Sequence, residues 1–78
     1  MIELRFYGLL RLESGIKSLC IEAGSIKELY ARAEEKHPIL TQDKLKNCII
    51  LINGKRAKGN ARLNSGDVVQ FLSPSAGG

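Results

Sequence analysis

The two glycines that end the sequence, Gly77 and Gly78, are the residues that point most directly to chemistry. They carry no side chain, so the carboxylate of Gly78 lies at the tip of a thin segment that can enter a channel where a Cβ would clash. Such a terminus suits delivery of its carboxylate into the active site of another protein. The alternative interpretation is a frayed end without a function, which is the common fate of termini.

The other reactive side chains do not form a catalytic or metal-binding pattern. Cys20 and Cys48 lie far apart, without a CxxC spacing or a companion histidine, so we interpret both as reduced packing residues. His37 and Tyr30 could act as an acid or base, but a histidine before proline and a tyrosine on an apolar stripe are more often structural. We expect no metal site and no cofactor bound by the isolated chain.

Length and charge narrow the classes of function. A chain of 78 residues allows one domain with little room for an enclosed catalytic pocket, so we do not expect a self-sufficient enzyme. The formal net charge is +4, and one stretch, residues 41–65, should make one end of the domain basic. Against Asp43 alone it carries Lys44, Lys46, Lys55, Arg56, Lys58 and Arg62.

Nucleic acid is the first partner that a basic surface suggests, because lysines and arginines neutralise phosphates. The sequence disfavours it, since its aromatic residues are too few for a stacking platform: Phe6, Tyr7, Tyr30 and Phe71. A face that docks on an acidic protein, or one that is only solvated, fits at least as well. There is no apolar run of membrane-spanning length and no leader pattern, so we expect no membrane contact and a cytoplasmic protein.

The strands that must position the terminus follow from hydrophobic periodicity. Alternation of apolar and polar residues predicts a strand over residues 2–7 and a second, antiparallel strand over residues 18–22. A turn is expected between them, around Glu13, Ser14 and Gly15.

The second half of the sequence predicts three further strands. An apolar, largely β-branched run predicts a strand over residues 48–52. Asn53 and Gly54 then signal a type I′ turn into a short strand at residues 55–57. A turn at residues 63–67 precedes the last strand, residues 68–72, and Pro74 ends the pairing because it has no N–H to donate.

One helix is predicted between these two groups of strands. Ser25 and Glu28 form a capping box, and Pro38 disfavours helical geometry at His37, so the helix should span residues 26–36. Its apolar stripe consists of Ile26, Leu29, Tyr30 and Ala33. Residues 39–47 are interpreted as a polar connection. This order of elements indicates an α+β roll in which the helix covers one sheet face.

The predicted order and the Gly-Gly terminus resemble the β-grasp fold of ubiquitin-like proteins, and the local residues resemble the small subunit of molybdopterin synthase, the MoaD family. The resemblance covers the whole chain. It is carried by Phe6 with residues 8–11, residues 25–36, Ile52 with Asn53 and Gly54, residues 66–69 and residues 71–78. The ThiS family of thiamin synthesis shares the fold and the Gly-Gly terminus, but it is usually shorter and lacks a proline at the position of Pro74.

The resemblance implies a β-grasp roll with a mixed sheet of about five strands packed on one main helix. Residues 1–72 would form the domain, and residues 73–78 would form a flexible tail that ends in Gly-Gly. The chain departs from the family pattern at Ser73, where a second proline is common, and at Ser75, where an apolar residue is common.

The function implied by the resemblance is that of a sulfur carrier and cosubstrate, not of an enzyme. A partner of the ubiquitin-activating type, similar to MoeB or ThiF, would use ATP to adenylate the Gly78 carboxylate. A persulfide from a sulfur donor would then displace AMP and lead to a thiocarboxylate. In the MoaD family this terminus enters the large synthase subunit, MoaE, and supplies sulfur for molybdopterin, the molybdenum cofactor.

The implied site lies at the C-terminal end of the sequence. Gly78 would be the adenylated residue, and Gly77 would keep the approach to it thin. The remaining residues of the partner-binding tail would be Ala76, Ser75, Pro74 and Leu72.

We expect the domain to dock through the sheet face beside this tail. Strand alternation puts Leu72 on the side opposite Phe71, so Leu72 and one side of residues 49–52 should be apolar and exposed there. The residues expected in the core are Ile50, Val69 and Phe71.

Three alternatives remain open from the sequence. A ThiS-like carrier for thiamin synthesis would use the same chemistry at Gly78. A protein modifier would pass the same activated glycine to lysines of target proteins. The third alternative is a basic interaction module in which the Gly-Gly terminus is incidental.

Overall fold

The computed structural model describes residues 1–57 and 59–73. Within this part of the chain, the helices lie between a first pair of strands and a last group of three strands, except for one short helix between the first two strands. The elements are β1 (Ile2–Tyr7), α1 (Leu9–Ser14), β2 (Ser18–Ile21), α2 (Ile26–Lys36), α3 (Gln42–Lys46), β3 (Ile49–Ile52), β4 (Lys55–Arg56) and β5 (Val68–Leu72).

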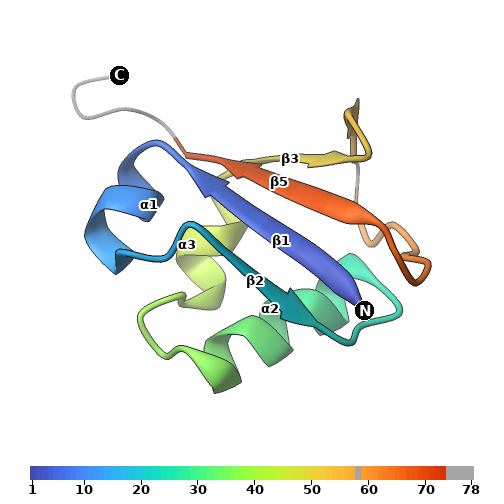
Figure 1. Cartoon of the computed structure of the whole chain (residues 1–78), viewed down its shortest axis with the longest axis horizontal. Coiled ribbons are helices and arrows are strands. Elements are labelled where there is room, and N and C mark those ends of the chain that lie inside the picture. The colour runs from blue at the N-terminus through green and yellow to red at the C-terminus, as the bar shows by residue number, and fades with distance from the viewer. Residues whose placement is uncertain (58, 74–78) are drawn as a thin grey trace.

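The strands form one mixed sheet with the spatial order β2-β1-β5-β3-β4. The two central strands, β1 and β5, run parallel, while β2 pairs antiparallel with β1 and β3 pairs antiparallel with β5. Figure 1 shows α2 and α3 on the same side of this sheet. The predicted α+β roll, with five strands and α2 as its main helix, is therefore confirmed for the described residues.

The core lies between the sheet and the helices and is built by strand alternation. Phe6 of β1 and Phe71 of β5 are paired in register, and their rings stack with centroids 5.2 Å apart. Both rings are fully buried, and burial of such a side chain stabilises a fold by about 1.5–3 kcal/mol. Val69 and Ile50 are buried beside them, so the predicted core residues of this region are confirmed.

The helix predicted over residues 26–36 is confirmed in its type and bounds. The hydroxyl of Ser25 accepts a hydrogen bond from Glu28 N at 3.2 Å, and the carboxylate of Glu28 accepts one from Gly24 N at 2.8 Å. The helix ends at His37, whose backbone is extended before Pro38, as expected for a residue that precedes proline.

Two short helices were not predicted. The segment expected to turn before Gly15 contains α1, and the segment interpreted as a polar connection contains α3. In α3, Thr41 caps the helix by accepting from Lys44 N at 3.3 Å, and Leu45 is fully buried. A capping threonine before one apolar residue is a weak pattern, because a helix this short has no full stripe.

The two cysteines differ from each other in exposure. Both thiols are free, as predicted. Cys48 is half-buried against the core, donates from Sγ to Lys44 O at 3.3 Å, and has its pKa raised by burial to about 11. Cys20 is exposed on edge strand β2, so its interpretation as a packing residue is wrong. Strand alternation explains the difference, since Leu19 and Ile21 point toward the core instead.

The turn between β3 and β4 is tied to the start of β5 by side chains. Asn53 and Gly54 have φ values of 51° and 85°, as the predicted type I′ turn requires. The side chain of Asn53 accepts from Val68 N and donates to an oxygen of Asp67, both at 2.9 Å. Asp67 also accepts from Asn64 N at 2.8 Å, and these hydrogen bonds hold the pKa of its carboxyl below the usual value.

Replacement of Asp67 by Asn should destabilise the fold at neutral pH. The two carboxylate oxygens of Asp67 accept from Asn53 Nδ2 and from Asn64 N, and an amide has an N–H₂ group in place of one of these oxygens, so one donor would face another donor. Since the pKa of the native carboxyl is lowered, its contribution is present above the unfolded value near 3.8 and disappears as the pH falls through the folded value. The urea midpoint of the native protein should therefore fall more steeply between pH 5 and pH 2 than that of D67N. The control is E13Q, which removes an exposed carboxylate; equal acid dependence of native protein and D67N would contradict the prediction.

Candidate functional site

The described structure ends at Ser73, the residue that precedes the predicted C-terminal site; we call Ser73 the root of this site. Leu72 is the last residue of β5, and Ser73 is the last residue described. The predicted roles of five residues stay predictions, because these residues lie outside the described part: Pro74, Ser75, Ala76, Gly77 and Gly78. The division into a domain of residues 1–72 and a tail of residues 73–78 stays a prediction for the same reason.

Ser73 is hydrogen bonded to the beginning of the chain. Its hydroxyl donates to Tyr7 O at 2.6 Å and accepts from Leu10 N at 2.8 Å. Its backbone N–H also donates to Tyr7 O, at 3.3 Å. Three contacts thus join the end of β5 to the segment that connects β1 with α1.

Gly8 lies directly against Ser73. Its φ is 76°, and a Cβ at this position would collide with Ser73 O and lie 2.8 Å from Ser73 Oγ. Only glycine combines this backbone conformation with so close an approach. The sequence analysis missed the contact, because nothing local at Gly8 or Ser73 indicates a partner more than sixty residues away.

The sheet has a partly apolar face on the side away from the helices. Tyr7, Leu72 and Ile49 are neighbours across β1, β5 and β3 at the end where Ser73 lies. Ile49 is 45% exposed, and Tyr7 and Leu72 are half-buried. We call these three residues the outer row. Leu72 therefore lies on the predicted face, although its neighbours cover part of it.

Exposed basic residues border the outer row. Arg56 of β4 lies opposite Leu51, which is on the same sheet face as Ile49. Arg56 and Lys46 also line a hollow of about 190 Å³ next to Ile49. All described basic residues of the stretch 41–65 are exposed: Lys44, Lys46, Lys55, Arg56 and Arg62. Lys58 lies outside the described residues.

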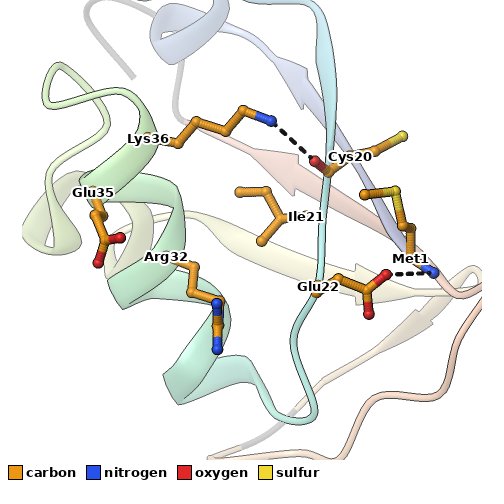
Figure 2. Close-up of a pocket in the computed structure, with 7 residues that line it drawn as sticks. All are labelled: Met1, Cys20, Ile21, Glu22, Arg32, Glu35 and Lys36. Carbon is orange, nitrogen blue, oxygen red and sulfur yellow. Dashed lines mark hydrogen bonds and ion pairs between the residues drawn. The ribbon is translucent and has the colours of Figure 1, made fainter.

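A second hollow, of about 330 Å³, lies between edge strand β2 and helix α2 (Figure 2). Lys36 Nζ donates to Cys20 O at 3.5 Å across it, and the amino group of Met1 pairs with Glu22 at 3.3 Å. Acidic and basic side chains occur together along its walls, so it has no single charge. None of its lining residues belongs to the predicted site.

The two residues that could act as an acid or base, Tyr30 and His37, occupy positions that support the fold. Tyr30 packs against the core, and burial raises the pKa of its phenol. His37 caps the end of α2, and its backbone N–H donates to Ala33 O at 2.9 Å. The described residues contain no cluster of three metal-ligating side chains. None of the helices in residues 1–57 and 59–73 has the length and apolar character that a membrane crossing needs.

Comparison with solved structures relates this geometry to known proteins. The chain is similar to a chain in the complex of subunits 1 and 2 of molybdopterin-converting factor from Helicobacter pylori 26695, with 32% identity and a TM-score of 0.71, over 99% of this chain and 97% of that one. It also shares the fold of SAMP1, small archaeal modifier protein 1, from Haloferax volcanii, with 17% identity and a TM-score of 0.84, over 99% and 98%.

The HVO 2177 protein of Haloferax volcanii is also similar, with 25% identity and a TM-score of 0.72, over 99% of this chain and 85% of that one. A search among curated proteins found no significant match. A model of the ThiS family matches residues 4–78, a range that includes both terminal glycines. The chain therefore belongs to the ThiS family, in agreement with its resemblance to the MoaD and ThiS type of ubiquitin-like sulfur carrier.

Proposed function

We propose that this protein is a sulfur carrier for molybdopterin biosynthesis and that its Gly78 carboxylate is converted to a thiocarboxylate. The observation that carries the proposal is the family match, which runs through the whole fold to Gly78. The similarity to the Helicobacter pylori complex, at 32% identity, favours the molybdopterin branch of the family. The protein acts as a cosubstrate and noncatalytic small subunit, since its reacting group is its own terminus.

The proposed chemistry takes place on one carbon atom, the carbonyl carbon of Gly78. A carboxylate is a poor electrophile, so an adenylating partner similar to MoeB or ThiF transfers AMP from ATP to it and releases pyrophosphate. A persulfide from a sulfur donor then attacks this carbon and displaces AMP. A second thiol then attacks the donor's sulfur in the resulting acyl disulfide, forms a disulfide with it and releases the thiocarboxylate. The chain itself contributes a terminus without side chains, because Gly77 and Gly78 have no Cβ.

The outer row is the proposed docking surface for a MoaE-like large subunit. Its residues are apolar or aromatic, and they lie at the end of the sheet from which the C-terminal residues continue. Residues 74–78 can span at most about 17 Å beyond Ser73, so the partner's active site has to lie within this distance of the root. We place this assembly in the cytoplasm, where ATP and the sulfur donor are available.

Removal of Gly77 and Gly78 should abolish thiocarboxylate formation and leave the stability of the fold unchanged, because neither residue has a side chain to bury and the core consists of residues before them. Intact protein from native cells should contain a form about 16 mass units heavier, localised to the C-terminal peptide to exclude oxidation elsewhere. The truncated protein should lack this form and keep its melting temperature. A Gly78 that carries no sulfur but is joined to lysines of other proteins would identify a protein modifier instead. A Gly78 with neither modification would favour the basic interaction module.

A charge in the outer row should weaken docking of the large subunit. I49D places a carboxylate at the most exposed position of the row and should raise the Kd for a MoaE-like subunit at least about tenfold, through desolvation of the charge. The matched control is I39D, since Ile39 is 43% exposed but lies in the connection between α2 and α3. Calorimetric titration of both variants checks the prediction. Equal affinities would show that the partner docks elsewhere.

A further inference from the structure

Helix α1 begins without a cap from its own segment. Gly8 occupies the N-cap position and has no side chain, so it cannot accept a hydrogen bond from the first turn. The hydroxyl of Ser73 takes this role by accepting from Leu10 N at 2.8 Å. The start of α1 and the end of β5 are therefore held together by one side chain.

The same hydroxyl fixes the direction in which the chain leaves the sheet. It donates to Tyr7 O at 2.6 Å, the same carbonyl that accepts from the backbone N–H of Ser73, so it reinforces the junction of β5 with β1. The backbone of Gly8 also lies close against Ser73. Pro74 adds a covalent restriction, because a residue that precedes proline is confined to extended conformations. Ser73 is thus restrained by its backbone, by its side chain and by the close approach of the segment that connects β1 with α1.

We propose that Ser73 is a positioning residue that aims the C-terminal residues at the active site of the adenylating partner. This inference rests on the proposed function, in which the Gly78 carboxylate has to reach an active site. If fully extended, residues 74–78 would span about 17 Å, so a rotation of about 30° at Ser73 would displace the tip by about 9 Å. Misplacement of a reacting group by 1 Å already costs up to about a hundredfold in rate.

A positioning role and a purely structural role predict different kinetics. S73A removes one partly buried hydroxyl and leaves the exposed surface of the domain intact, so the KM for the carrier should change little. The fraction of docked carriers whose carboxylate is in place should fall, which lowers kcat. A structural cap alone would lower the melting temperature and leave kcat unchanged wherever the protein is folded.

The test follows pyrophosphate release by an adenylating enzyme of the ubiquitin-activating type from the same organism, with ATP and full-length carrier. S73A should lower kcat about tenfold with KM changed less than about twofold. S73T keeps the hydroxyl and should retain most of the rate. The matched control is S65A, which removes a hydroxyl that accepts a hydrogen bond from the N-terminal amino group, far from Ser73 in the fold's contacts, and it should behave as the native protein.

Exchange of the Leu10 amide in the free carrier shows whether the contact is lost, since its acceptor is the Ser73 hydroxyl. If S73A does not fold, S73C replaces it, because a thiol preserves the shape but forms only weak hydrogen bonds. A native kcat in a folded variant with faster Leu10 exchange would overturn this inference alone. Absence of pyrophosphate release with the native protein would overturn the proposed function and the inference with it.

Discussion

The parallel pairing of β1 with β5 determines where the other parts of the structure lie. These strands come from opposite ends of the sequence and form the centre of the sheet, with Phe6 stacked on Phe71 between the sheet and the helices. The pairing leaves Ser73, the residue after β5, beside the first residues after β1. The core, the outer row and the contact between Ser73 and Gly8 all depend on this register, because a shift by one residue would exchange the two faces of β5.

Local patterns in the sequence predict the elements whose determinants are local. Helix α2 has its cap and its apolar stripe within one segment, and the turn at Asn53 and Gly54 has the required residue types side by side. The same reasoning misses α1, because its cap comes from Ser73, a residue remote in sequence. It misses α3 because Leu45 alone provides the buried contact of that helix. The burial predicted for Cys20 is also wrong, since a small apolar residue fits either face of an edge strand.

The candidate site also has features that the sequence predicts and features that only the fold reveals. The chemical character of the terminus depends only on residue type, so Gly77 and Gly78 could be identified without a fold. The face on which Leu72 lies follows from alternation, but the neighbours that cover part of it become known only from the strand order. The network of Asn53 and Asp67 gives the Gly66-Asp67 motif a physical role, because the carboxylate fastens the hairpin turn to the start of β5.

The position of β5 in the sheet also affects how the chain matures during synthesis. It is the last described strand to leave the ribosome, yet it lies between β1 and β3 and contributes Val69 and Phe71 to the core. A nascent or prematurely terminated chain therefore lacks the centre of its sheet and leaves two strands with unpaired edges, which favours aggregation. A chain that ends before β5 is thus unable to complete the sheet, whereas one that ends after Ser73 still contains every described strand.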